Sequence, residues 1–447
     1  MSYIDAFLER DKDRINVIER VDGKREYRQY STKYVFYYPD PKGKHRTIHG
    51  NPVSRFSTKQ IKEFDKEKKI YSHQKLYESD INPIFRCLEE NYLGMDSPEP
   101  HVCFFDIEVD FDKDRGFAPP HDPHARITAI TLYLNWLPEE QRLITLCLKP
   151  VQLPQAEAEQ ISMSYDNTVL CKDESELIDL FLKFIEDADI LSGWNSEGFD
   201  IPYMVNRVAK VMSKSHTRRF CLWDKMPKER RFERYGAEQQ TFDLIGRIHL
   251  DYMELYRKYT YHEMHSYSLD AIGEYELGDR KVEYDGTLDQ LYNNDFEKFI
   301  AYSRQDVELL VKLDTKLQFI DLANVLAHSN TVLIPTTMGA VAQTDQAIIN
   351  EAHRQGLIVH DKRYDRDTTQ AAGAYVANPK KGMHKWVGSI DLNSLYPSIL
   401  RSGNMSTETI IGQVRHTYTR EMIENAKTVA EAWEGRFATH EYEKVME

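Results

Sequence analysis

The stretch Val102-Cys-Phe-Phe-Asp-Ile-Glu-Val109 is apolar except for two acidic residues, and it has the pattern of a buried strand. Side chains alternate between the two faces of a strand, so Asp106 and Glu108 share one face while Phe105 and Ile107 share the other. Neighbouring carboxylates on an apolar strand repel each other and lose hydration unless a cation lies between them. A divalent metal ion explains the pair; two exposed surface acids are the alternative.

The segments around this stretch predict an α/β layer. Two more strands are expected at Ile127–Leu134 and Leu143–Leu148, followed by a helix that begins at a capping pair of Asp173 and Glu176. A short strand over 189–192 comes next, and this order is compatible with a ribonuclease-H-like sheet. A second helix is expected over 296–319, then connecting helices to about residue 370, and strand character returns at 375–376 and 386–390.

Length and composition favour a soluble protein of several domains. The 447 residues suggest roughly two to four domains, and no apolar run approaches the roughly 18 residues that cross a bilayer. The charged start lacks a signal-peptide core, so we expect a cytoplasmic protein, in the host cell if it is viral, without membrane contact. Five scattered cysteines without a CxxC pair indicate reduced, buried thiols.

Charge is unevenly distributed. The net charge of −14 argues against a protein that simply coats nucleic acid, yet residues 207–234 contain ten lysines and arginines. Phe220, Trp223, Phe232 and Tyr235 are interleaved with these basic residues. Basic side chains with aromatic neighbours suit single-stranded DNA, and a solvated charged surface is the alternative.

Two further acidic positions follow the strand pair. The stretch Ser192-Gly-Trp-Asn-Ser-Glu-Gly-Phe-Asp200 leaves a strand through a glycine-containing turn and places Asp200 where a helix begins, so an N-cap is the alternative role. Tyr302 and Asp306 are four residues apart and therefore share one face of the helix over 296–319; a surface pair is the alternative.

Taken together, these three acidic motifs and their order along the chain resemble the three exonuclease motifs of family B DNA polymerases. Asp391-Leu-Asn-Ser-Leu-Tyr-Pro-Ser398 resembles the first polymerase motif of that family. Segments 250–256, 281–286 and 373–376 are most similar to the replicative polymerases of T-even-type bacteriophages. The resemblance implies a 3′→5′ proofreading exonuclease with two Mg²⁺ ions, with Mn²⁺ able to replace them, acting on single-stranded 3′ ends and on primer-template DNA.

The resemblance also implies roles for particular residues. The exonuclease metals would be held by Asp106, Glu108, Asp200 and Asp306. Tyr302 would orient the attacking water, and Lys281 would lie near the scissile phosphate, with an exposed turn lysine as the alternative. In the polymerase site Asp391 would bind metal, and the residues around the incoming nucleotide would be Leu392, Ser394, Leu395 and Tyr396, the last lying under the sugar.

The expected architecture is an α/β multidomain chain. Residues 1–100 would form an N-terminal mixed domain, completed by about 325–375; residues 101–324 the ribonuclease-H-like exonuclease domain; and residues 376–447 the start of a polymerase palm. Residues 392–447 contain no K-x-x-x-N-S-x-Y-G or D-T-D motif, so we expect exonuclease activity alone.

Use of deoxynucleoside triphosphates would then need the missing half of the polymerase. Either a second polymerase chain supplies that half, or the sequence is a fragment of a longer chain. A stand-alone exonuclease and a non-catalytic nucleic-acid-binding polymerase subunit are the alternatives.

Overall fold

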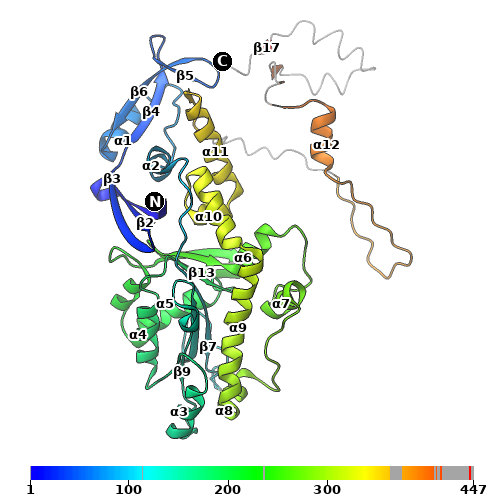
Figure 1. Cartoon of the computed structure of the whole chain (residues 1–447). Coiled ribbons are helices and arrows are strands. Elements are labelled where there is room, and N and C mark those ends of the chain that lie inside the picture. The colour runs from blue at the N-terminus through cyan, green and yellow to red at the C-terminus, as the bar shows by residue number, and fades with distance from the viewer. Residues whose placement is uncertain are drawn as a thin grey trace. The chain divides into compact units, whose positions relative to one another are not determined.

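The computed structural model describes residues 2–112, 114–234, 237–362, 375–406, 409, 413–414 and 442–443 (Figure 1). The chain divides into two compact units. The first consists of Met1–His45 with Val53–Asp361, and the second of Arg46–Pro52 with Lys362–Glu447. All the helices and strands that surround the predicted acidic residues 106, 108, 200 and 306 belong to the first unit.

A six-stranded sheet forms the centre of the first unit, in the order β10-β9-β8-β7-β11-β14. The β7–β8 and β8–β9 pairs are antiparallel, whereas β10 pairs with β9, and β11 pairs with both β7 and β14, in parallel. The sheet is therefore mixed, as a ribonuclease-H-like layer requires. Its strands are β7 (Val102–Val109), β8 (Ile127–Leu134), β9 (Leu143–Leu148), β10 (Thr168–Cys171), β11 (Ile190–Gly193) and β14 (Ile248–Asp251).

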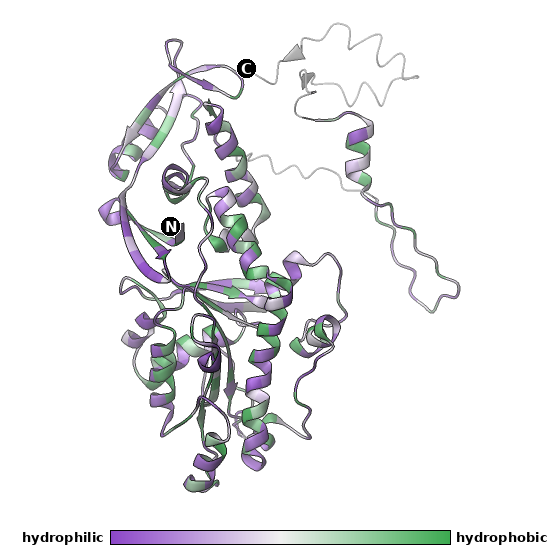
Figure 2. Cartoon of the chain, in the orientation of Figure 1, coloured by the Kyte–Doolittle hydropathy of each residue, from purple (hydrophilic) through white to green (hydrophobic). Residues whose placement is uncertain are grey.

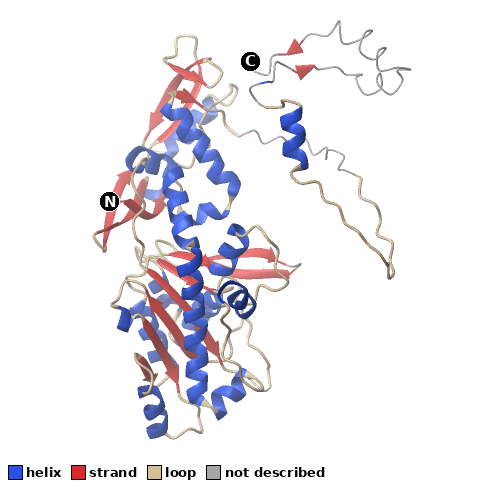
Figure 3. Ribbon diagram, turned by 45° about the vertical axis from the view of Figure 1, so that its right-hand side comes forward, coloured by secondary structure: helices blue, strands red, loops and turns tan. Residues whose placement is uncertain are grey.

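Helices cover both faces of this sheet. On one face Phe105 and Ile107 share a core with Phe181 of α4 (Glu174–Phe184) and Ile201 of α5 (Asp200–Val211). On the other face Phe104 shares a core with α9 (Phe296–Leu317). Figure 3 shows α9 lying across the strands, and Figure 2 shows apolar residues gathered along them. Because Asp106 alternates with Phe105, it lies on the α9 face.

The local sequence patterns account for most of these elements. Strands β7, β8 and β9 have the predicted bounds. The Asp173 side chain accepts a hydrogen bond from the Glu176 amide at 2.9 Å and starts α4, as the capping pair predicts. Strand β11 starts one residue later than expected. Helix α9 ends at Leu317, two residues early, because Gln318 adopts a left-handed conformation (φ 54°).

The N-terminal residues form smaller sheets beside the central one. Strands β1, β2 and β3 form an antiparallel sheet, and β4 pairs with β6. The Tyr3 hydroxyl donates to the carbonyls of Ala327 and Val332 at 3.0 and 2.7 Å, so the first strand packs on α10. The bounds are β1 (Ser2–Glu9), β2 (Arg14–Val21), β3 (Lys24–Ser31), β4 (Tyr34–Pro39), β6 (Pro52–Thr58), α1 (Ile61–Ile70), α2 (Pro83–Tyr92), α10 (Phe319–Asn330), α11 (Ala340–Arg354) and β15 (Leu357–Ile358).

The remaining elements of the first unit are short. They are α3 (Gln155–Met163), the hairpin β12 (Lys228–Arg234) with β13 (Ala237–Asp243), α6 (Tyr252–Tyr259), α7 (Leu269–Leu277) and α8 (Leu288–Asn294). Short 3-10 turns occur at Arg10–Lys12, Glu139–Gln141, Lys214–Phe220 and Ile334–Met338.

The second unit contains β5 (His45–Thr47) in part, α12 (Leu395–Ser402) and the two-residue pair β16 (Gln413–Val414) and β17 (Tyr442–Glu443). The strands expected at 375–376 and 386–390 are wrong, because these residues form no strand. An apolar alternation predicts which side chains favour burial, but a strand also needs a hydrogen-bonding partner. Trp386 and Ile390 are instead 100% and 95% exposed. Gly373 and Ala374 lie outside the described residues.

Two predictions from composition can be compared directly with the structure. All five cysteines are free and buried, as expected. Among the described helices, none combines the length and apolar character needed to cross a lipid bilayer.

Candidate metal centre

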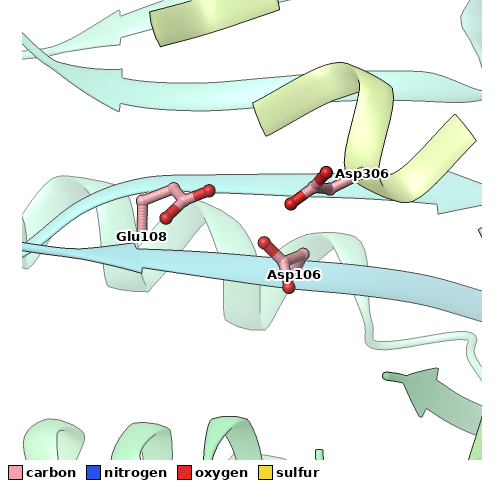
Figure 4. A group of neighbouring side chains, drawn as sticks. All are labelled: Asp106, Glu108 and Asp306. Atoms are coloured by element: carbon pink, nitrogen blue, oxygen red, sulfur yellow. The ribbon is translucent and has the colours of Figure 1, made fainter. Parts of the chain in front are cut away.

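Three acidic side chains from two elements converge between β7 and α9. Asp106 and Glu108 extend from β7, and Asp306 extends from α9 toward them (Figure 4). One carboxylate oxygen from each residue lies within 4.8 Å of the other two. Glu108 and Asp306 are only 6% and 3% exposed, which excludes the surface-pair alternatives for both motifs.

The position of α9 brings Asp306 to the strand pair. Ser303 lies one helical turn before Asp306, and its hydroxyl is hydrogen-bonded to that of Thr131 on β8 at 2.8 Å. Residues three apart on a helix share a face, so this buried contact directs Asp306 toward the sheet. Thr131 lies opposite Asp106 in the β7–β8 register.

Asp200 lies next to this cluster rather than within the closest group of three. It is the first residue of α5, with Phe199 at the N-cap position, so the N-cap alternative is wrong. The side chain is 4% exposed, and burial, followed by the neighbouring Asp106 carboxylate, raises the pKa of Asp200 well above its ordinary value. This electrostatic coupling links the second acidic motif to the first.

The buried carboxylates of the cluster repel one another. Burial, and then repulsion from Asp306, raises the pKa of Asp106 to about 7. Burial and the same acidic neighbours also raise the pKa of Glu108. Asp306 Oδ1 is buried and has no hydrogen-bond partner within the described part of the chain. An all-carboxylate donor set with an unsatisfied oxygen fits a hard divalent cation such as Mg²⁺.

Lys281 and Tyr302 complete the surroundings of the carboxylates. The Lys281 ammonium lies 2.5 Å from Asp306 Oδ2 and 3.3 Å from the Tyr302 hydroxyl, so Lys281 is paired rather than free in a turn. Although burial opposes its charge, Asp306 and Asp106 raise the pKa of Lys281. Burial, followed by the acidic neighbours, raises the pKa of Tyr302, which keeps the phenol neutral.

Two cavities adjoin the cluster, and Lys281 lines both. One, of about 660 Å³, is also lined by Asp106 and by the side chains of Trp194, Asn195, Gln239, Met253, Arg257 and Tyr267. The other, of about 630 Å³, is lined by Tyr284 and Tyr302 together with charged residues. Both volumes lie in the range of small-ligand sites.

The other predicted residues lie elsewhere. Asp391, Leu392, Ser394, Leu395 and Tyr396 belong to the second unit, where they are exposed.

Much of the basic segment 207–234 is engaged within the fold. Arg207 pairs with Glu174 at 2.6 Å, Arg219 with Asp179 at 2.7 Å and Arg230 with Glu197 at 2.5 Å. These ion pairs favour a structural role for the three arginines over a role in binding single-stranded DNA. Tyr235 lies outside the described residues.

Sequence reasoning missed Arg257 and Tyr267, although both line the larger cavity. Neither residue belongs to an acidic motif, and nine residues of chain separate them. The aromatic-rich stretch Tyr252–Tyr259 was the available signal, but its pattern is also that of an ordinary buried helix.

Comparison with known proteins agrees with the geometry. Residues 47–272 match the family model "DNA polymerase family B, exonuclease domain", and residues 334–445 match "DNA polymerase family B".

Individual relatives point to the same family. The chain is 33% identical over 275 residues to the DNA-directed DNA polymerase of Escherichia phage RB69, covering 60% of this chain and 30% of that protein. It is 30% identical over 226 residues to the enzyme of Enterobacteria phage T4, covering 51% and 25%.

A eukaryotic relative is the DNA polymerase delta catalytic subunit of Drosophila melanogaster, 27% identical over 263 residues, covering 54% of this chain and 23% of that protein. The matched regions thus span less than a third of each of these relatives. The exonuclease-domain match alone covers just over half of the chain, and the chain belongs to DNA polymerase family B.

Proposed function

We propose that this chain is the N-terminal part of a replicative DNA-directed DNA polymerase of the T-even bacteriophage type, and that it carries a metal-dependent 3′→5′ exonuclease. The observation that carries the proposal is the convergence of Asp106, Glu108 and Asp306, with one oxygen of Asp306 buried and unsatisfied. The two phage relatives support the assignment to the T-even type.

The four acidic residues Asp106, Glu108, Asp200 and Asp306 would hold two Mg²⁺ ions, and Mn²⁺ could replace them. When bound, the ions supply an acidified water and offset negative charge on the phosphorus oxygens and the leaving 3′-oxygen. The buried positions of Glu108 and Asp306 keep bulk water away from the charges that the carboxylates carry.

The remaining residues of the centre contribute hydrogen bonds and charge. Because its pKa is raised, Tyr302 stays neutral and is a poor base, so its hydroxyl orients the attacking water. The Lys281 ammonium contacts Asp306 and Tyr302. It is therefore close enough to the metal centre to stabilise negative charge that develops on the phosphate.

The proposed substrate is the single-stranded 3′ end of DNA, including a primer end that frays from its template. A mismatched terminus unpairs at lower cost than a paired one, so the unpairing energy favours removal of errors. The two cavities that Lys281 lines offer room for nucleotides near the carboxylates.

Polymerisation is proposed only for the complete protein. Asp391 would bind the palm metals, and the backbone and side chains of Leu392, Ser394, Leu395 and Tyr396 would contact the incoming deoxynucleoside triphosphate. The match of residues 334–445 to the family supports this assignment. The fingers, the rest of the palm and the thumb would come from a second chain or from further sequence.

We also propose the domain limits 1–100 with about 325–375, 101–324 and 376–447, and action in the host cytoplasm.

The test is an assay of the purified chain on 5′-labelled single-stranded DNA with Mg²⁺. Stepwise shortening from the 3′ end is expected, and EDTA or the double change Asp106→Ala with Glu108→Ala should abolish it. The non-catalytic subunit alternative predicts binding without shortening. Full activity in Asp306→Ala would contradict the proposed set of metal ligands.

A second arm separates the polymerase fragment from a stand-alone exonuclease. Primer extension should be absent with the chain alone and should appear when the complementary polymerase half is added. Asp391→Ala should abolish that extension and leave the exonuclease rate unchanged. A complemented mixture that never extends a primer would favour the stand-alone exonuclease.

A further inference from the structure

Arg257 and Tyr267 form a stacked pair in the wall of the larger cavity. We infer that Arg257, held over the Tyr267 ring, binds a backbone phosphate of the single strand whose 3′ end reaches Asp106. This inference rests on the proposed function. It adds a substrate-binding position outside the acidic motifs, contributed by α6 and by the loop before α7.

The cavity connects this pair with the carboxylates. Its wall includes Arg257 and Tyr267 as well as Asp106 and Lys281. At about 660 Å³ it has room for a nucleotide that is larger than the scissile phosphate alone. A strand whose end lies at Asp106 would therefore extend into the space that Arg257 lines.

The geometry of the pair is that of a preorganised arginine. The guanidinium carbon lies 4.0 Å from the centroid of the Tyr267 ring. The ring is itself fixed, because Trp194 Nε1 donates to the Tyr267 carbonyl at 2.9 Å and the Tyr267 hydroxyl accepts from the Met264 amide at 3.3 Å. Stacking lowers the conformational freedom that Arg257 loses when it binds a ligand.

Arg257 has hydrogen-bonding capacity left over. Its Nε is buried and makes no hydrogen bond to any residue that the structure describes. The ion-pair partner of this nitrogen is the Glu254 carboxylate. Its Oε1 lies 3.9 Å from Arg257 Nε, which is too far for a hydrogen bond. A planar guanidinium with free donors matches the oxygens of a phosphodiester.

A phosphate fits this position better than a base. A base would need an open aromatic face, whereas Arg257 covers one face of the Tyr267 ring. What the pair presents to the cavity is positive charge and N–H groups. The Asp106 carboxylate lines the same cavity, so Arg257 also offsets the repulsion that a polyanion meets there.

The first experiment measures binding without cleavage. The anisotropy of a fluorescent single-stranded oligonucleotide is titrated with the full chain in EDTA, for the wild type and for Arg257→Met, Arg257→Lys and Lys258→Met. Lys258 is the adjacent residue of α6 and does not line the cavity, so its change removes the same charge at a different place.

Arg257→Met should weaken binding about tenfold, and it should lower the slope of log affinity against log salt by about 0.7, the value of one lost contact to single-stranded DNA. Arg257→Lys should restore the slope and only part of the affinity, whereas Lys258→Met should match the wild type. Equal effects of the Arg257 and Lys258 changes would overturn the inference.

The second experiment locates the phosphate. Single methylphosphonate linkages, which lack the negative charge, are placed one at a time along the oligonucleotide. One linkage near the 3′ end should weaken wild-type binding and have no further effect on Arg257→Met. Additive effects at every linkage would contradict the inference. If the wild type binds DNA with this pattern but never shortens it, the proposed function fails and the phosphate site stands.

Discussion

Lys281 shows how one side chain can stabilise a cluster of buried acids before a metal ion binds. Its ammonium lies 2.5 Å from Asp306 Oδ2, and the Asp106 and Glu108 carboxylates also act on its charge. The other Asp306 oxygen stays unsatisfied. A bound cation would take over the neutralising role of the lysine, so the two positive charges compete for the same carboxylates.

Replacing Lys281 by methionine should therefore tighten metal binding. We expect Mn²⁺ affinity to rise about tenfold, because the ion no longer has to displace or repel a neighbouring ammonium. Calorimetric titration of the DNA-free chain with Mn²⁺ measures this. Arg280→Met is the matched control, since Arg280 is the preceding residue and pairs with Glu274 instead of the cluster. An equal gain in both variants would show only the effect of net charge.

At the scale of elements, the turn between β11 and α5 decides where Asp200 lies. A Cβ atom on Gly193 would be 2.8 Å from the Phe105 carbonyl oxygen and 2.9 Å from the Ser196 Cβ. The end of β11 can approach β7 so closely only without a side chain at this position. This contact sets the start of α5 next to the acidic strand.

Gly193→Ala should consequently destabilise the fold by about 2 kcal/mol and lower exonuclease activity further by displacing Asp200. Urea unfolding and the single-strand assay measure the two effects. Gly198→Ala is the comparison, because the nearest atoms to its Cβ would belong to the movable Asn195 side chain, from 3.1 Å. A Gly193 variant as active as the Gly198 variant would remove the proposed role of the close approach.

A second element-scale contact joins α11 to the residues around α2. His353 is hydrogen-bonded to Glu78 at 2.9 Å and to Glu89 at 2.6 Å. Burial favours the neutral ring, but the two carboxylates prevail and raise the pKa of His353 to about 9. A raised histidine pKa stabilises the fold fully below its unfolded value near 6.5, and the contribution disappears as pH rises through 9.

The difference in unfolding free energy between the wild type and His353→Gln should thus shrink by about 3 kcal/mol from pH 6 to pH 10. Urea melts of both proteins at pH 6, 8 and 10 measure it, and taking the difference cancels groups that titrate in both. A difference that stays constant with pH would mean that the two carboxylates do not raise the pKa of His353 in the folded protein.

These elements also show what the sequence could predict. Strands β7, β8 and β9 and helix α9 followed from alternation and helical spacing, because those patterns are local. The convergence of Asp106, Glu108 and Asp306 followed from the family motifs. The pairing of Lys281 with Asp306 and the stack of Arg257 on Tyr267 depend on how separate loops pack. The strand expected at 386–390 failed for the same reason, because a strand depends on its partner.

At the scale of the first compact unit, an ion network connects the N-terminal sheet to the central sheet. Arg20 on β2 donates to Asp189, the residue before β11, at 2.9 Å from Nε and 2.5 Å from Nη2. The Arg20 and Asp189 side chains are 2% and 1% exposed. Asp189 also accepts from the His101 amide just before β7, at 3.0 Å. The network therefore holds the start of both strands that carry or position acidic residues.

Asp189→Asn should destabilise the first unit by about 3 kcal/mol, because Arg20 would keep a buried charge without its closest neutralising partner. Asp187→Asn is the matched control. Its side chain is 48% exposed and also contacts Arg20, at 3.1 Å, so its change should cost less than about 1 kcal/mol. Urea unfolding measures both, and hydrogen exchange should show β2 and β3 losing protection first in Asp189→Asn. Equal stability of the two variants would mean that the buried pair contributes no more than an exposed one and that apolar packing alone joins the two sheets.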